Sequence, residues 1–165
     1  LLILNAEVEI AAKAGLRHLP LSAFILGNRR TALKANEMVS ALRIPLESTV
    51  GKSGFLKLGA RSYLVISVSM AALRLDVDEA GLISKIALSV GACSEVAMRM
   101  DRAEAALLGT PLATATERVI LEHFEELAPI DDVRAPASYR RQASVEVVRR
   151  LLADQQRDFA NGVNA

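Results

Sequence analysis

The sequence predicts an α+β fold, in which strands and helices occupy separate parts of the chain. Alternating or β-branched apolar segments fill residues 6–100, whereas helical patterns with start and stop signals fill residues 101–155. No helical pattern interrupts the first part. We therefore expect a three-stranded antiparallel sheet packed on three helices, preceded by the last strands of another α+β domain.

The first fifty residues predict a hairpin and one further strand. Residues 6–12 alternate, with Val8 and Ile10 on one face, and residues 16–21 return after a turn at 13–15. Residues 37–44 form the next strand, 26–31 a loop and 46–53 a linker. The opening residues 1–4 lack an initiator Met and resemble mid-strand sequence, so we expect a piece of a longer polypeptide.

Residues 54–75 join two cations to an apolar run. Lys57 and Arg61 lie among Gly54 and Gly59, and β-branched residues follow. This pattern predicts a ligand-facing loop that leads into a strand, with Gly59 permitting close approach of the backbone to the ligand. By composition alone, two solvated surface cations are the more ordinary explanation. Strands are expected over 63–77 and 82–91, joined by a turn at 78–81, with a short third strand over 95–100.

Three helices are expected in the remaining residues. Asp101 with Glu104, and Thr114 with Glu117, have capping-box spacing for the first two. Pro136 begins the third. The apolar faces comprise Ile120, Phe124 and Leu127 on the second helix, then Tyr139, Ala143, Val147 and Leu151, and Val145, Val148 and Leu152, on the third. The width of this last face favours contact with another subunit or domain, a second copy included, and the polar tail after Gln155 is expected to fray.

Composition limits the function classes. The chain has 165 residues, of which 52% are hydrophobic, 24% charged and 4% aromatic, so the core must be mainly aliphatic. A net charge of +1 gives no electrostatic case for nucleic-acid binding. No apolar run reaches the length of a membrane span, and the lone Cys93 cannot hold an iron–sulfur cluster. We expect a cytoplasmic protein.

Catalytic and metal-binding motifs are not evident. Neither GxGxxG nor GxxxxGK[ST] occurs. His18 and His123 are far apart in sequence, and structural roles are favoured for both. Asp131 and Asp132 resemble a carboxylate pair, but they precede a helix, so capping and ion pairing are favoured over catalysis.

Several blocks in order resemble the flavoprotein subunit of the molybdenum hydroxylases, the family of xanthine dehydrogenase and aerobic carbon monoxide dehydrogenase. Residues 3–9, 24–31 and 37–45 resemble the end of the family's flavin domain, with Asn28 where an F-x-x-G-Y-R-x-T loop has Tyr. Residues 55–67 resemble the junction with the C-terminal domain. Residues 103–109, 129–134 and 139–141 resemble the C-terminal signature.

The resemblance implies a function and a division of the chain. It implies that residues 1–53 end an FAD-binding domain and that residues 54–165 form a C-terminal domain of the carbon monoxide dehydrogenase flavoprotein type. The parent subunit would pass electrons from 2Fe-2S clusters through FAD to NAD or another acceptor. The clusters and the molybdenum cofactor would belong to partner subunits, an iron–sulfur subunit and a molybdenum subunit.

The resemblance also assigns site residues. It implies FAD contacts for Lys57 and Val39, and a position near the flavin edge for Arg61. Ser62, Tyr63 and Leu64 stand where animal xanthine dehydrogenases carry acidic residues, which favours the carbon monoxide dehydrogenase branch and disfavours NAD. The Gly-rich flavin loops would lie upstream of Leu1, so this chain alone is expected to bind FAD weakly or not at all and to be inactive. The alternative is a non-catalytic docking module that binds no flavin.

Overall fold

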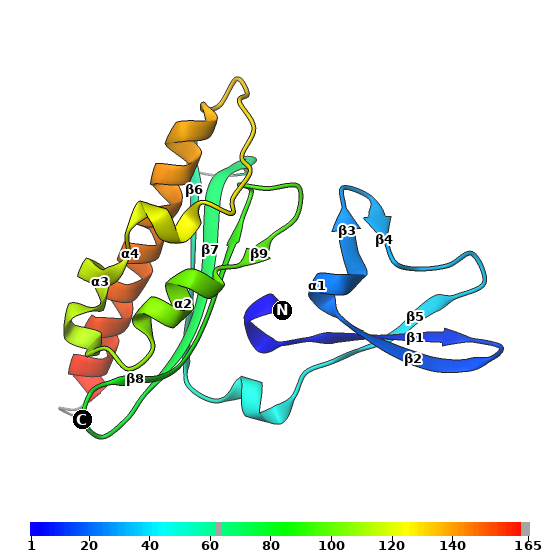
Figure 1. Ribbon diagram of the computed structural model, residues 1–165, viewed down its shortest axis with the longest axis horizontal. Coiled ribbons are helices and arrows are strands. Elements are labelled where there is room, and N and C mark those ends of the chain that lie inside the picture. Colours follow the sequence, from blue (N-terminus) through cyan, green and yellow to red (C-terminus); the bar gives the residue numbers. More distant parts are fainter. Residues whose placement is uncertain (62–63, 163–165) are drawn as a thin grey trace. The chain divides into compact units, whose positions relative to one another are not determined.

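The computed structural model describes residues 1–61 and 64–162. Apart from a four-residue helix at Leu21–Phe24 and short 3-10 helices, the helices follow the strands along the chain, which confirms the predicted α+β class. The chain divides into two compact units, Leu1–Val50 and Gly51–Ala165. In Figure 1 the first unit runs from blue to cyan and the second from cyan to red.

The first unit is built on an antiparallel sheet of order β2-β1-β5. Its elements are a 3-10 helix at Leu2–Leu4, β1 (Glu7–Ala12), β2 (Gly15–Pro20), α1 (Leu21–Phe24), β3 (Ile25–Gly27), β4 (Arg30–Thr31), β5 (Met38–Arg43) and a 3-10 helix at Leu46–Thr49. Gly15 makes the β1–β2 turn with a φ of 126°, a value that favours glycine. The predicted hairpin and following strand are therefore present.

The core of this unit is small and apolar. Val8 and Ile10, on one face of β1, pack with Leu21 and Phe24 of α1. Two local expectations are wrong. Residues 2–4 form a 3-10 helix that buries Ile3 rather than a strand, and the expected loop at 26–31 contains the short β3–β4 hairpin.

An ion pair holds the loop between β4 and β5 against β2. The Arg17 guanidinium donates to both carboxylate oxygens of Glu37, at 2.8 and 2.7 Å, and to the Ala32 carbonyl at 2.8 Å. The Lys34 backbone N–H also donates to Glu37, at 2.8 Å. The hydrogen bonds from Arg17 and Lys34 lower the pKa of Glu37 from 4.5 to about 2.

The first unit should therefore lose stability in acid. Because the folded-state pKa of Glu37 lies below its unfolded value, its contribution is present above pH 4.5 and is lost as the pH falls towards about 2. We expect Glu37→Gln to reduce the hydrogen-exchange protection of β2 and β5 at pH 5. In this variant the protection should also fall less between pH 5 and 2 than in the unmodified chain. Glu47→Gln, at an exposed glutamate of the same unit, is the control. The same decline in both variants would contradict this role.

The second unit contains an antiparallel sheet of order β6-β7-β8-β9. Its strands are β6 (Lys52–Gly59), β7 (Ser67–Val77), β8 (Ile83–Gly91) and β9 (Met98–Arg99). The sheet has one strand more than expected, because residues 52–59 pair with β7 along their whole length, from Lys52 opposite Leu75 to Gly59 opposite Ser67. The expected loop, together with the last two residues of the expected linker, is thus an edge strand, whereas the linker begins with the 3-10 helix at Leu46–Thr49.

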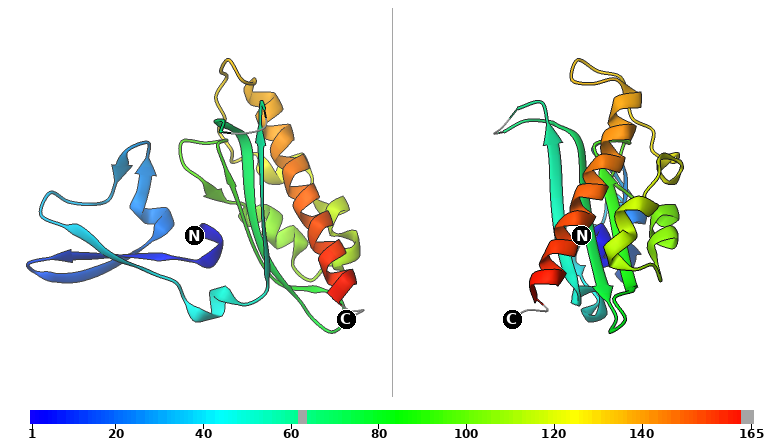
Figure 2. Two further views of the ribbon diagram at one scale, coloured as in Figure 1. Left: turned by 180° about the vertical axis from the view of Figure 1, so that it is seen from behind. Right: turned by 90° about the vertical axis from the view of Figure 1, so that its left-hand side faces the viewer.

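Helices cover one face of this sheet, as Figures 1 and 2 show. They are α2 (Asp101–Leu107), α3 (Ala115–Arg118) and α4 (Ala137–Gly162), with 3-10 helices at Leu112–Thr114 and Leu121–Phe124. The long α4 lies along β6 and β7 on one side and against α3 and both 3-10 helices on the other. Its two apolar rows are buried within the unit except for Tyr139, which is 49% exposed. The wide apolar face of α4 is thus largely buried against the sheet and the other helices of its own unit.

Three details of the helical part differ from expectation. Neither Asp101 nor Thr114 caps a helix with its side chain; Glu104 instead accepts from Arg99 and from the Leu88 N–H. The second helix is four residues long, and the chain continues as a 3-10 turn. After Gln155 the chain remains helical to Gly162, where the Gln156 side chain donates to the carbonyls of residues 112 and 113, at 2.6 and 3.2 Å.

Candidate functional site

Lys57 lies on β6, the edge strand, and its side chain is exposed. Its Nζ donates to the carbonyl of Val65 at 2.8 Å, which ties the strand to the returning arm of the β6–β7 hairpin. An ammonium group has three N–H donors. With one donor directed to Val65, the other two are available to an anionic or carbonyl-bearing ligand.

The glycines of β6 serve packing within the chain. A Cβ at Gly59 would lie 2.4 Å from Cγ1 of Val65, so any larger residue would force the Val65 side chain to move. A Cβ at Gly54 would lie 3.1 Å from Leu151 and 3.2 Å from Gln155 on α4. The structure therefore gives Gly59 a packing role against Val65, and its role in the approach of a ligand stays a prediction.

The other predicted site residues lie in two places. Arg61 is exposed in the β6–β7 connection, on the same hairpin as Lys57. Val39 is 41% exposed on β5 of the first unit, opposite Ile10 of β1. Three residues stand where animal xanthine dehydrogenases carry acidic residues, and they bear on the choice of electron acceptor. Leu64 is 95% exposed, whereas Ser62 and Tyr63 lie outside the described residues.

A groove runs between β6 and α4 beside Lys57. It has a volume of about 300 Å³. It is lined by Leu56, Lys57, Leu58, Tyr139, Gln142, Ala143, Glu146, Val147 and Arg150. Its floor is apolar, and the Glu146–Arg150 ion pair, at 2.7 Å, lies on its rim. Sequence reasoning placed Tyr139 in a buried row, and no local signal indicated that it lines a groove.

Asp131 and Asp132 are structural, as expected. Asp131 accepts from the Ala137 N–H at 2.6 Å and so caps α4. Asp132 accepts from the guanidinium groups of Arg134 and Arg140, both at 2.7 Å. Hydrogen bonds from the backbone N–H of Arg134 and from the Arg140 side chain hold the pKa of Asp132 well below its usual range. Both carboxylates are committed to the fold.

The histidines also occupy structural environments. His18 contacts Glu9 at 3.1 Å and Arg43 at 3.0 Å on the exposed face of the first sheet. Glu9 also accepts from Ser40, and the hydrogen bonds from His18 and Ser40 lower its pKa. Nδ1 of His123 is buried in the second unit. Within residues 1–61 and 64–162, no cluster of His, Cys, Asp or Glu has an arrangement that suits a metal ion.

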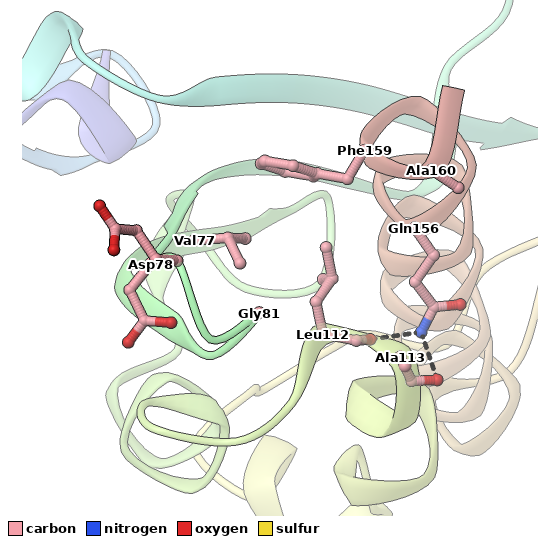
Figure 3. A pocket seen from close by; sticks show the side chains of 9 residues that line it. Val77, Asp78, Gly81, Leu112, Ala113, Gln156, Phe159 and Ala160 are labelled. Carbon is pink, nitrogen blue, oxygen red and sulfur yellow. Dashed lines mark hydrogen bonds between the residues drawn. The ribbon is translucent and has the colours of Figure 1, made fainter. Parts of the chain in front are cut away.

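A second cavity, of about 540 Å³, lies at the far end of α4 (Figure 3). Its apolar wall includes Val77, Leu112 and Phe159. Gln156 points to the backbone carbonyls of Leu112 and Ala113, and one oxygen of Asp78 accepts from two N–H groups of its own turn. These polar groups therefore stabilise the turn and the helix end.

Two protein-family models match this chain and show which family it belongs to. Residues 55–155 match the model of the CO dehydrogenase flavoprotein C-terminal domain. The chain belongs to this family. Residues 1–47 match a second model, the FAD binding domain in molybdopterin dehydrogenase. These matches confirm the resemblance seen in the sequence.

FAD subunits of two dehydrogenases resemble this chain along nearly its full length. It is 28% identical to the nicotinate dehydrogenase FAD-subunit of Eubacterium barkeri over 98% of the chain and 56% of that protein. It is 26% identical to the xanthine dehydrogenase FAD-binding subunit of Escherichia coli O157:H7 over 93% and 53%. The chain thus spans about half the length of the curated relatives it matches.

Solved structures show the same fold. Quinoline 2-oxidoreductase from Pseudomonas putida 86 matches 93% of this chain and 53% of its own, with a TM-score of 0.78 and 25% identity. Reconstituted CO dehydrogenase from Oligotropha carboxidovorans matches 92% of this chain and 52% of its own, with a TM-score of 0.79 and 25% identity.

No helix in the described part of this chain combines the length and apolarity that crossing a membrane requires.

Proposed function

We propose that this chain is part of the flavoprotein subunit of a cytoplasmic molybdenum hydroxylase, an FAD-dependent oxidoreductase. The observation that carries the proposal is the pair of family matches, to an FAD binding domain over residues 1–47 and to the flavoprotein C-terminal domain over 55–155. FAD, when bound, accepts electrons from iron–sulfur clusters and passes them to NAD or another acceptor. Residues 1–53 would end the FAD domain and 54–165 form the C-terminal domain.

Partner subunits follow from the same proposal. The relatives are named as FAD subunits of nicotinate and xanthine dehydrogenases. An iron–sulfur subunit would supply the electrons, and a molybdenum-cofactor subunit would hold the substrate. The substrate is therefore a property of the complex rather than of this chain.

Lys57, Arg61 and Val39 are the residues we assign to FAD. The Lys57 ammonium is exposed and has two N–H donors beyond the one used for Val65, which fits contact with a flavin oxygen or phosphate. A cation beside the flavin stabilises negative charge on the reduced ring. Arg61 adds charge from the same hairpin, and Val39 offers an exposed apolar side chain from β5.

Lys57→Ala in the full-length subunit tests this role. We expect weaker FAD occupancy or a midpoint potential lower by about 30 mV, which corresponds to ~1.4 kcal/mol for a two-electron couple. Lys57→Arg should retain most of the FAD occupancy and midpoint potential of the unmodified subunit, because it keeps the charge. Lys85→Ala, at an exposed lysine on β8, is the matched control.

The competing function is a docking module that binds no flavin. The apolar groove beside Lys57 favours this reading, because exposed apolar surface is typical of interaction sites. Unchanged flavin occupancy, absorbance and potential in Lys57→Ala would reject the cofactor role of Lys57 and favour docking.

A further inference from the structure

The cavity at the far end of α4 is large enough for a small molecule. Its volume of about 540 Å³ falls within the range of about 300–1,000 Å³ that is typical of ligand pockets. It lies within the second unit, between the β7–β8 turn, the 3-10 helix at Leu112–Thr114 and the last turns of α4 (Figure 3). None of the three residues assigned to FAD lines it, so a ligand here leaves those residues free.

Hydrogen bonds between these three segments fix the walls of the cavity. The Leu112 N–H donates to the Gly81 carbonyl at 3.0 Å, which joins the 3-10 helix to the β7–β8 turn. The Gln156 side chain donates to two carbonyls of the same 3-10 helix, at 2.6 and 3.2 Å, and so joins it to α4. One oxygen of Asp78 accepts from two N–H groups of its own turn. The cavity is therefore formed before a ligand binds, which lowers the entropy lost on binding.

The polar side chains of the wall have acceptors to offer and no donors. Among the described residues that line the cavity, Gln156 alone has side-chain N–H donors, and these are directed to the 3-10 helix. The second carboxylate oxygen of Asp78 and the whole carboxylate of Glu79 make no hydrogen bond or ion pair with the described part of the chain. A ligand that satisfies these atoms must bring N–H donors or positive charge.

The charges and the aromatic ring also favour a cation. Asp78 and Glu79 bring two carboxylates to the rim, and no Lys, Arg or His is among the described lining residues. Phe159 contributes an aromatic ring to the wall, and the face of such a ring attracts cations. The same ring already holds a cation from outside the cavity. Nζ of Lys52 lies 4.2 Å from the ring centre and donates to the Asp158 carbonyl near the negative end of α4.

We propose that this cavity binds a small organic cation, an ammonium or guanidinium group carried on a compact apolar or aromatic body. The body packs against Val77, Leu112 and Phe159, which form the apolar wall. The cationic group lies at the rim beside Asp78 and Glu79. Carboxylates and phosphates are repelled by the same two side chains, so the cavity selects a ligand of opposite charge to FAD.

NMR titration of the full chain with three probes of similar shape tests the charge selectivity. The probes are 2-phenylethylammonium, neutral 2-phenylethanol and anionic 3-phenylpropionate. The cation should give saturable shifts of amides in residues 77–82, 112–113 and 156–160, and should bind at least about fivefold more tightly than the other two probes. Added salt should weaken its binding. Equal affinity for the three probes, or no saturable shift of these amides by the cation, would overturn the proposal.

Two substitutions test the residues that recognise the cation. Glu79→Gln removes a charge from an exposed side chain that makes no contact the fold requires, and Phe159→Leu removes the ring but keeps an apolar residue. Each should raise the dissociation constant of 2-phenylethylammonium about threefold. Glu126→Gln, at an exposed glutamate outside the cavity, is the charge-matched control and should leave the constant unchanged. The same change in the two glutamate variants, or none in Phe159→Leu, would contradict binding at this cavity.

Discussion

Arg140→Ala should destabilise the second unit by about 3 kcal/mol, because it removes the cation of a buried polar cluster. Arg140 is 3% exposed. Its guanidinium donates to Asp132 at 2.7 Å and to the Val68 carbonyl at 2.9 Å, with longer contacts of 3.4 Å to the carbonyls of Ala92 and Ala135. Removal takes the guanidinium donor from the Ala92 carbonyl and leaves the Val68 carbonyl with only the weak Cys93 thiol donor.

The position of this cluster explains why the effect should be large. Arg140 joins four segments: the first turn of α4, the loop that precedes it, the start of β7 and the end of β8. The neighbouring Cys93 and Ser144 are buried beside it, with Ser144 Oγ 2.9 Å from Ser69 Oγ. One side chain therefore fixes the end of the sheet at which the β6–β7 hairpin turns.

The measurement is urea denaturation of the full chain, followed by hydrogen exchange of β7 amides to report on the second unit. Arg150→Ala is the matched control on the same helix. Its ion pair with Glu146 is exposed and of the i,i+4 type, so its loss should cost less than about 0.5 kcal/mol. Similar losses in the two variants would show that the Arg140 cluster contributes no more than a surface pair.

Helix α4 and the central strands could be predicted because their signals are local. Pro136 and the apolar rows that follow mark α4, and β-branched runs mark β7 and β8. The helix also continues past Gln155, where the polar sequence suggested fraying. Its end is stabilised by Gln156 and Phe159 through contacts with residues remote in sequence, which a local pattern does not contain.

The sequence prediction missed strand β6, because two glycines and two lysines within eight residues favour a loop, although Leu56 and Leu58 alternate with the exposed Lys57. Gly54 and Gly59 suggested a ligand-facing loop, yet each lies against α4 or Val65, where an added Cβ would force a neighbouring side chain to shift. The need for glycine arises from tertiary packing. Lys57 was proposed for the site from family resemblance, and the structure adds its exposure, its bond to Val65 and the groove beside it.

The second helix illustrates a different limit. Ile120, Phe124 and Leu127 have helical spacing, but the structure buries only the last two, and Ile120 is 43% exposed. The chain breaks after Arg118 and forms a 3-10 turn at Leu121–Phe124. The spacing identified the core residues Phe124 and Leu127 correctly, although the backbone that presents them is not one helix.

Phe124→Ala should be the most destabilising single substitution in the helical part, with a loss of about 3–5 kcal/mol. The ring is fully buried in the main core, which α2, α4 and the sheet share. A short 3-10 turn has few hydrogen bonds of its own, so its position depends on this side chain. Leu121→Ala, on the same turn but 41% exposed, should cost less than about 1 kcal/mol. Thermal and urea unfolding of both variants would separate burial of the ring from disturbance of the turn, and equal losses would assign the effect to the turn.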